Sequence, residues 1–306
     1  MNVVVLGPQH ANPTIAGVLR SLAGKGPVAL ITAGLQEREG EASAIPELGI
    51  PAINLELHKR AEEVFAKDRE LAVATKARQN RLRLMQDFYR ARLEHANLAA
   101  RAISVRHVDE ELLAEESLVS MAVIRRLDQD HLARCREVQH EFVSRWDLLN
   151  RSHVARHRQD LAAMIERTSA VVLAGGHVAV LLNRPRLFDV GSMFGKRPIV
   201  GWAAGGMVLT ERVVLFHDQP PYGQAIAEVL DVGLGLAPGL VALPNPRLRL
   251  HLHDVARVTH YAQRFAPATC VALDHGARVD VRDGCMVGGD DAQLLRSDGT
   301  IDRSWP

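Results

Sequence analysis

The chain has 306 residues, of which 47% are hydrophobic and 24% charged, and its formal net charge is +1. This length and composition fit a globular protein with one large α/β domain or two smaller ones. The nearly neutral charge argues against nucleic acid or an anionic membrane as a partner. No apolar run reaches the roughly 18 residues of a membrane-spanning helix.

Cysteine usage points to a reducing compartment. Cys135, Cys270 and Cys285 are widely spaced and form no CxxC pair. Such thiols are typical of the cytoplasm, where we expect this protein to be. The opening residues MNVVVLGPQH lack the basic region and cleavage site of a signal peptide, and predict a first strand instead.

Short apolar runs, several of them ending at or near a glycine, occupy the two ends of the chain. They lie at 3–6, 28–32, 52–55, 170–174, 198–201, 213–216, 233–243, 269–273 and 277–281. Such runs are typical of parallel strands covered on both faces. We therefore predict an α/β fold, with one mostly parallel sheet flanked by helices over 1–55 and 170–290. The polar residues 291–306 are predicted to form a loose C-terminal tail.

The middle of the chain has a different pattern. From 56 to 167 there is neither glycine nor proline, and apolar residues recur at helical spacing among charges of both signs. This predicts a long all-helical insertion over 56–169, with breaks near 104–109, 128–130 and 150–152. Its arginines and histidines are interpreted as a solvated or interhelical face rather than an RNA surface.

Apolar stripes on these predicted helices must be buried somewhere. They run through Leu82, Met85, Phe88 and Tyr89, and through Phe142, Trp146 and Leu149. One possibility is that the helices pack only on one another and on the sheet. The other is that part of a stripe forms the contact of a two-fold homodimer.

Residues 199–209 read IVGWAAGGMVL, an apolar strand that enters a glycine-framed turn. Gly201 and Gly205 frame this turn as in a nucleophile elbow, Gly-x-Ser-x-Gly, with Ala203 in the place of the serine. A methyl group has no lone pair with which to attack a substrate. The alternative is an ordinary strand–turn–helix of a parallel sheet, in which small residues permit close packing.

Two further motifs end or follow predicted strands. Gly175 and Gly176 precede His177, and paired glycines there can present backbone N–H groups to an oxyanion, although a tight turn is the simpler interpretation. His251 and His253 have a spacing seen in metal sites. They are predicted to open a helix, however, where residues two apart do not face each other, so we expect neither a metal nor a cofactor.

In order and spacing, these segments resemble the cyanophycinase and dipeptidase E-like family of serine peptidases, which has the class I glutamine amidotransferase-like fold. Members have a strand ending Gly-Gly-Asp-Gln, an elbow Gly-Thr-Ser-Ala-Gly-Ala, a Gly-Leu-Gly-Leu turn and a strand ending Asp-Gln-His-Phe. The corresponding segments here are 175–178, 201–206, 233–236 and 243–246. The resemblance covers 170–285 and, more weakly, 1–55.

The departures from this family are chemical. Ala203 stands at the nucleophile, Asn245 where the histidine belongs, and His177 at the acidic position. A serine peptidase needs a nucleophile and a base. The resemblance therefore implies a catalytically inactive binding or assembly protein with a small-molecule or peptide ligand. The candidate ligand-binding residues are Gly175, Gly176, His177, Trp202, Ala203, Ala204, Asn245, Asp274 and His275.

Two alternatives remain open from the sequence. The chain could be a hydrolase with a non-standard site, in which His177, Asp274 and His275 perform acid–base work and water or the substrate supplies the nucleophile. It could also be a structural subunit that joins a complex through its helical insertion.

Overall fold

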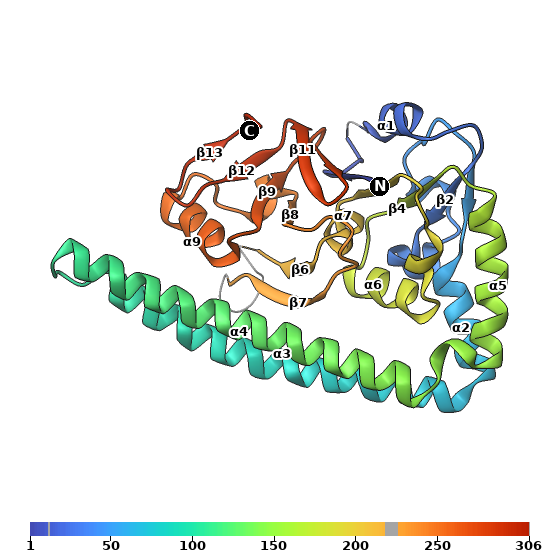
Figure 1. The fold of residues 1–306 in the computed structure, drawn as a ribbon, viewed down its shortest axis with the longest axis horizontal. Helices are drawn as coiled ribbons and strands as arrows, with labels where there is room; N and C mark the ends of the chain where they lie inside the picture. Colours follow the sequence, from blue (N-terminus) through green and yellow to red (C-terminus); the bar gives the residue numbers. More distant parts are fainter. Residues whose placement is uncertain (12, 218–225, 306) are drawn as a thin grey trace.

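The structure is a computed structural model that describes residues 1–11, 13–217 and 226–305. Its main sheet has seven strands in the order β11 (Cys285–Asp290), β10 (Arg278–Arg282), β1 (Asn2–Leu6), β5 (Ile199–Trp202), β4 (Ala170–Leu173), β2 (Val28–Ile31) and β3 (Ala52–Asn54). The five strands from β1 to β3 in this order are parallel, and β10 and β11 extend the sheet as an antiparallel edge (Figure 1). The predicted fold class, a mainly parallel sheet flanked by helices, is confirmed.

Alternating residues of the strands bury two faces of the sheet. On one face, Val4 and Leu30 pack with Ile15 and Leu19 of helix α1 (Ile15–Leu22). The other face joins a larger buried cluster with helices α2 (Leu57–Lys67), α5 (Ser152–Glu166), α6 (Val178–Leu187) and α7 (Ala204–Leu209). Burial on both faces explains why the strands are apolar without interruption.

The C-terminal part of the chain does not belong to the same sheet. Strands β8 (Leu240–Pro244) and β9 (Thr269–Leu273) pair with β12 (Gln293–Leu295) and β13 (Ile301–Asp302) in a separate four-stranded sheet, beside helix α9 (Val255–Phe265). Strands β6 (Arg212–Leu215) and β7 (Glu228–Val232) form a two-stranded ribbon. The prediction of one sheet was therefore wrong, because apolar runs reveal strands but not their partners.

The prediction of a loose tail over 291–306 was also wrong. Leu294 pairs with Val271 of β9, and both Leu294 and Leu295 are buried. The polar residues that suggested disorder form the turns between these strands, whereas the apolar residues close the second sheet.

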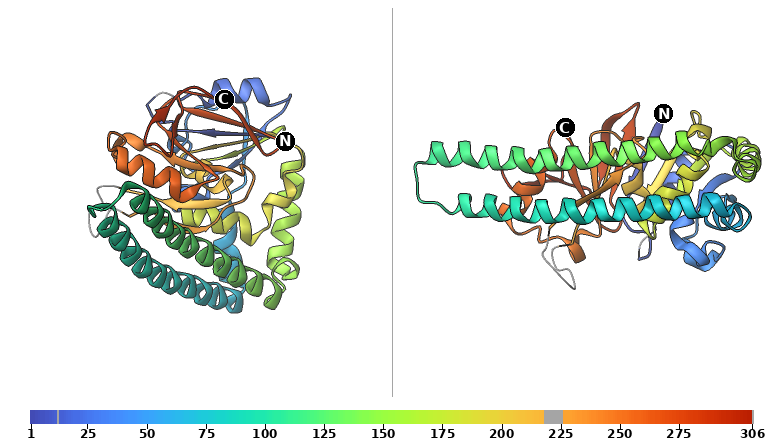
Figure 2. Two further views of the ribbon diagram at one scale, coloured as in Figure 1. Left: turned by 60° about the vertical axis from the view of Figure 1, so that its left-hand side comes forward. Right: turned by 90° about the horizontal axis from the view of Figure 1, so that it is seen from below.

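Residues 57–166 contain no strand. Two 36-residue helices, α3 (Arg69–Ser104) and α4 (Glu110–Arg145), form an antiparallel hairpin that runs along the body, with its tip beyond α9 (Figures 1 and 2). The predicted break near 128–130 is wrong, since Asp128 is buried in an ion pair with Arg264 rather than capping a helix. The predicted breaks near 104–109 and 150–152 are confirmed. A break that was not predicted lies at Asp68, whose carboxylate accepts the N–H of Leu71 at 3.0 Å and caps α3. None of the helices in the described ranges has the length and apolarity that crossing a bilayer requires.

Candidate functional site

Ala203, at the end of β5, has the backbone conformation of a strained elbow. Its φ is +48° and its ψ is −119°, and α7 begins at the next residue. Its N–H donates to the carbonyl oxygen of Leu6 at 3.1 Å. An L-residue held at positive φ outside a relaxed well costs of order 1–3 kcal/mol, so the surrounding structure must impose it. This geometry favours the elbow over an ordinary turn.

The two frame glycines are required by close backbone contacts. A Cβ on Gly201 would lie 2.8 Å from the carbonyl carbon of Gly205, and a Cβ on Gly205 would lie 2.2 Å from the carbonyl oxygen of Leu173. Both distances are below any van der Waals contact, so no side chain fits at either position. The backbone of the elbow therefore packs directly against β5 and the end of β4.

The loop after β4 meets the loops after β2 and β5. His177 N donates to the carbonyl oxygen of Gly34 at 2.7 Å, and a Cβ on Gly175 would lie 3.3 Å from the Cβ of Ala203. Gly176 has a φ of +125° and lies against Gly34, where a side chain would clash. These loops line the carboxyl ends of parallel strands, the edge at which α/β sheets bind ligands.

His177 does not point freely into this edge. Its Nδ1 accepts the N–H of Val180 at 3.4 Å, which makes His177 the cap of α6. Trp202 and Ala204 flank the elbow, but their side chains are buried in the two core clusters. A ligand above Ala203 would therefore meet Ala203 and the glycines first.

One further residue at this edge, Gln36, carries no signal in the sequence. Gln36 lies two positions after Gly34 and has φ +56° and ψ −124°, nearly the same strained conformation as Ala203. Its side chain is half-buried. No sequence signal identifies a glutamine at positive φ, because the residue type that usually marks this conformation is glycine.

The other predicted residues lie at the ends of β8 and β9. Asn245 follows β8 in a left-handed conformation, which asparagine tolerates better than most residues, and its N–H donates to Leu273 O at 3.1 Å. Asp274 is buried and forms an ion pair with Arg247. His275 Nδ1 lies 3.2 Å from the carbonyl oxygen of Pro8.

The segment after β1 connects these two groups of residues. Leu6 accepts the N–H of Ala203, while a Cβ on Gly7 would lie 1.8 Å from the carbonyl oxygen of Asp274. The nine predicted residues thus surround the carboxyl end of β1 from both sides. In the described part of the chain, however, no hydrogen bond or ion pair joins the side chains of His177, Asp274 and His275 to one another.

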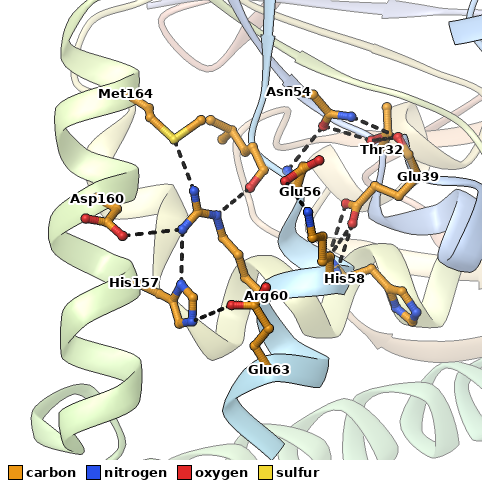
Figure 3. Close-up of polar contacts among 12 residues, drawn as sticks. Thr32, Glu39, Asn54, Glu56, His58, Arg60, Glu63, His157, Asp160 and Met164 are labelled. Atoms are coloured by element: carbon orange, nitrogen blue, oxygen red, sulfur yellow. Dashed lines mark hydrogen bonds and ion pairs between the residues drawn. The ribbon is translucent and has the colours of Figure 1, made fainter. Parts of the chain in front are cut away.

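A polar cluster fixes the loop that carries Gln36 (Figure 3). The buried carboxylate of Glu39 accepts the N–H groups of His58 and Lys59 at 2.9 and 3.0 Å, at the start of α2. Burial raises the pKa of Glu39, and these two backbone hydrogen bonds oppose the rise. Asn54 donates to the Glu39 carbonyl oxygen at 2.8 Å. These contacts hold the loop in place against the start of α2.

Across residues 1–11, 13–217 and 226–305, no group of three or more histidine, cysteine, aspartate or glutamate side chains could hold a metal ion.

The fold and this edge define an α/β protein whose strained strand–turn–helix carries no nucleophile. No protein-family model matches the chain, and no curated protein sequence matches it. Among solved structures, a peptidase from an acI-B1 Actinobacterium is 12% identical, with a TM-score of 0.39, 97% of this chain covered and 91% of the other. A candidate peptidase E of Listeria monocytogenes EGD-e is 8% identical, with a TM-score of 0.44 and coverages of 97% and 99%. Both TM-scores are below 0.5, so these similarities do not indicate a function for this chain.

Proposed function

We propose that this protein is a non-hydrolytic binding protein that takes a small molecule or short peptide at the edge around Ala203. The observation that carries the proposal is the elbow conformation of Ala203, with φ +48° and ψ −119°, combined with a methyl side chain. An elbow is strained in order to present one side chain, and this chain keeps the strain without the reactive atom.

The neighbouring groups also lack the geometry of a hydrolase. A nucleophile needs a base within about 3 Å, and that base needs an orienting partner. Asn245, at the position that the family resemblance assigns to a histidine, has an amide that does not act as a base. His177 Nδ1 is engaged in capping α6, and Asp274 pairs with Arg247.

Activity assays test the chemical part of the proposal. The purified protein should not hydrolyse acidic dipeptides, simple amides or cyanophycin. Ala203→Ser should be equally inactive, because a serine hydroxyl without a base is a weak nucleophile. Turnover that persists through purification and disappears in His177→Ala or His275→Ala would establish the hydrolase alternative instead.

A matched pair of glycine variants tests the binding part. A methyl group on Gly175 would lie 3.3 Å from the Cβ of Ala203, whereas one on Gly191 would meet nothing within 4 Å. A dipeptide and amide panel is screened by thermal shift and calorimetry. Gly175→Ala should weaken any ligand that binds the wild type, and Gly191→Ala should not. Equal affinity of the wild type and both variants would show that the ligand binds elsewhere on the protein.

A further inference from the structure

The α3–α4 hairpin, with its connecting loop, carries most of the large apolar side chains that are exposed in the described part of the chain. Ten of the thirteen large apolar side chains that are exposed lie between residues 73 and 123. They are Val73, Leu84, Phe88, Leu98, Val105, Val108, Leu112, Leu118, Val119 and Val123. Single exposed apolar residues are ordinary, but their concentration on one element marks an interaction surface. No described element covers the face of the hairpin that is turned away from the sheets (Figure 2).

The base of the hairpin, residues 69–84 and 134–146, contains an apolar groove of about 700 Å³. Val73, Ala77, Val138, Phe142 and Trp146 contribute its apolar wall. Its charged lining has a net formal charge of +2, from four arginines and two glutamates: Arg69, Arg78, Arg81, Arg145, Glu70 and Glu141. The groove lies between α3 and α4 and is open to solvent. Such a groove suits an apolar helix end with acidic residues beside it.

The tip of the same hairpin, residues 98–119, has that complementary character. Its exposed apolar residues include Leu98, Val105, Leu112 and Val119. Its five acidic residues outnumber its two arginines, which gives a formal charge of −3. The base has eight basic and three acidic residues, a formal charge of +5. Opposite charges that flank apolar surfaces favour and orient association.

We propose that two copies of this chain dock through their hairpins in an antiparallel, two-fold arrangement, with the tip of each in the basal groove of the other. The helices are equal in length, 36 residues each, so one two-fold axis near the middle of the hairpin forms both contacts at once. Phe88 lies near the midpoint of α3 with 60% of its surface exposed, and the axis places it beside its counterpart. The surface is self-complementary, as a closed dimer requires.

Charge reversal gives a decisive test on the full-length protein. The tip variant combines Glu115→Lys with Glu116→Lys, which changes the formal charge of the tip from −3 to +1. The base variant combines Arg69→Glu, Arg81→Glu and Arg145→Glu, which changes the formal charge of the base from +5 to −1. The wild type should be a dimer in sedimentation and light scattering at tens of micromolar, and each variant alone should be a monomer. An equimolar mixture of the two variants should form dimers again, because in the mixed pair both tip–base contacts have opposite charges.

Several outcomes would overturn the proposal. A monomeric wild type would show that this surface does not join two copies of the chain. If either charge-reversal variant remains a dimer, the interface lies outside the tip and the base. If the two variants stay monomeric when mixed, tip–base contacts are excluded. Phe88→Glu, which leaves the tip and base charges unchanged, should also give a monomer. Val287→Glu, at a 51% exposed position on β11, should remain a dimer. Circular dichroism checks that each variant is folded.

Discussion

Asp128 of α4 and Arg264 of α9 form a buried, two-point ion pair that fastens the helical hairpin to the body. The guanidinium donates from Nε to Oδ2 and from Nη2 to Oδ1, both at 2.8 Å. The Tyr89 hydroxyl donates to Asp128 at 2.7 Å and accepts the N–H of Val229 at 3.1 Å. Burial alone would lower the pKa of Arg264, but the charge and hydrogen bonds of Asp128 raise it. The Arg264 guanidinium is therefore charged, and both carboxylate oxygens of Asp128 accept its hydrogen bonds.

Removing one partner of this pair should be costly. In Asp128→Asn the Arg264 guanidinium keeps its charge in a buried site without a counter-ion, so we expect a loss of about 3–5 kcal/mol in the free energy of unfolding. Denaturant titration measures this loss. Glu141→Gln is the control, because Glu141 lies on the same helix as Asp128 but forms an exposed ion pair, with Arg81 of α3. Loss of that exposed pair should cost less than about 1 kcal/mol. Losses of equal size would refute the special role of the buried pair.

The strain at Ala203 predicts an unusual gain in stability. Ala203→Gly removes the steric cost of positive φ, of order 1–3 kcal/mol, and adds a flexibility cost of about 0.5–1 kcal/mol. The variant should therefore unfold at a higher temperature than the wild type. Ala204→Gly, one residue later inside α7, should instead lose about 1 kcal/mol. If both variants lose stability, the strained conformation does not exist in solution.

Local sequence patterns predicted the features that depend on local physics. The strands around Val28 and Ala170 follow from uninterrupted apolar runs, and the elbow follows from the glycines around Ala203. Asp68 and Asp128 show the limit of this approach. Both lie in helical, charge-rich sequence, but one caps a helix and the other pairs with Arg264 across 136 residues of chain.

Partners that are distant in the sequence account for the other errors. Which strand lies beside β9, and whether Leu294 is free or paired, depends on long-range packing that no periodicity encodes. The strain at Gln36 is equally invisible, because it is imposed by the loop's tertiary contacts rather than by residue type.

The paired tail can be tested directly. Leu294 is buried between β9 and β13, so Leu294→Ala should cost about 2–5 kcal/mol in the free energy of unfolding. Val287→Ala removes a similar side chain from an exposed position and should change stability by no more than about 0.5 kcal/mol. If both variants change the free energy of unfolding by the same small amount in denaturant titrations, the tail is loose, as its polar composition predicts.

His260 on α9 should make the protein sensitive to acid. Burial, followed by the nearby charges of Arg264, Arg257 and Arg101, lowers its pKa to about 4, and Asp128 only partly opposes this. A histidine in the unfolded chain titrates near 6.5. Below that pH the unfolded state takes up a proton that the folded state does not, so stability falls as the pH drops towards 4. The loss from this group approaches about 3 kcal/mol and is absent above pH 7.

Comparison of the wild type with His260→Gln isolates this contribution. Burial also lowers the pKa values of His131 and His157, but both remain in the variant and their effects cancel in the difference. Free energies of unfolding measured at pH 7 and at pH 4.5 should fall further for the wild type than for the variant. Arg101→Gln removes one of the cations around His260, so it should raise the His260 pKa, as followed by NMR titration of the ring proton. Parallel stability curves for wild type and His260→Gln, with an NMR pKa near 6.5, would show that His260 is open to water.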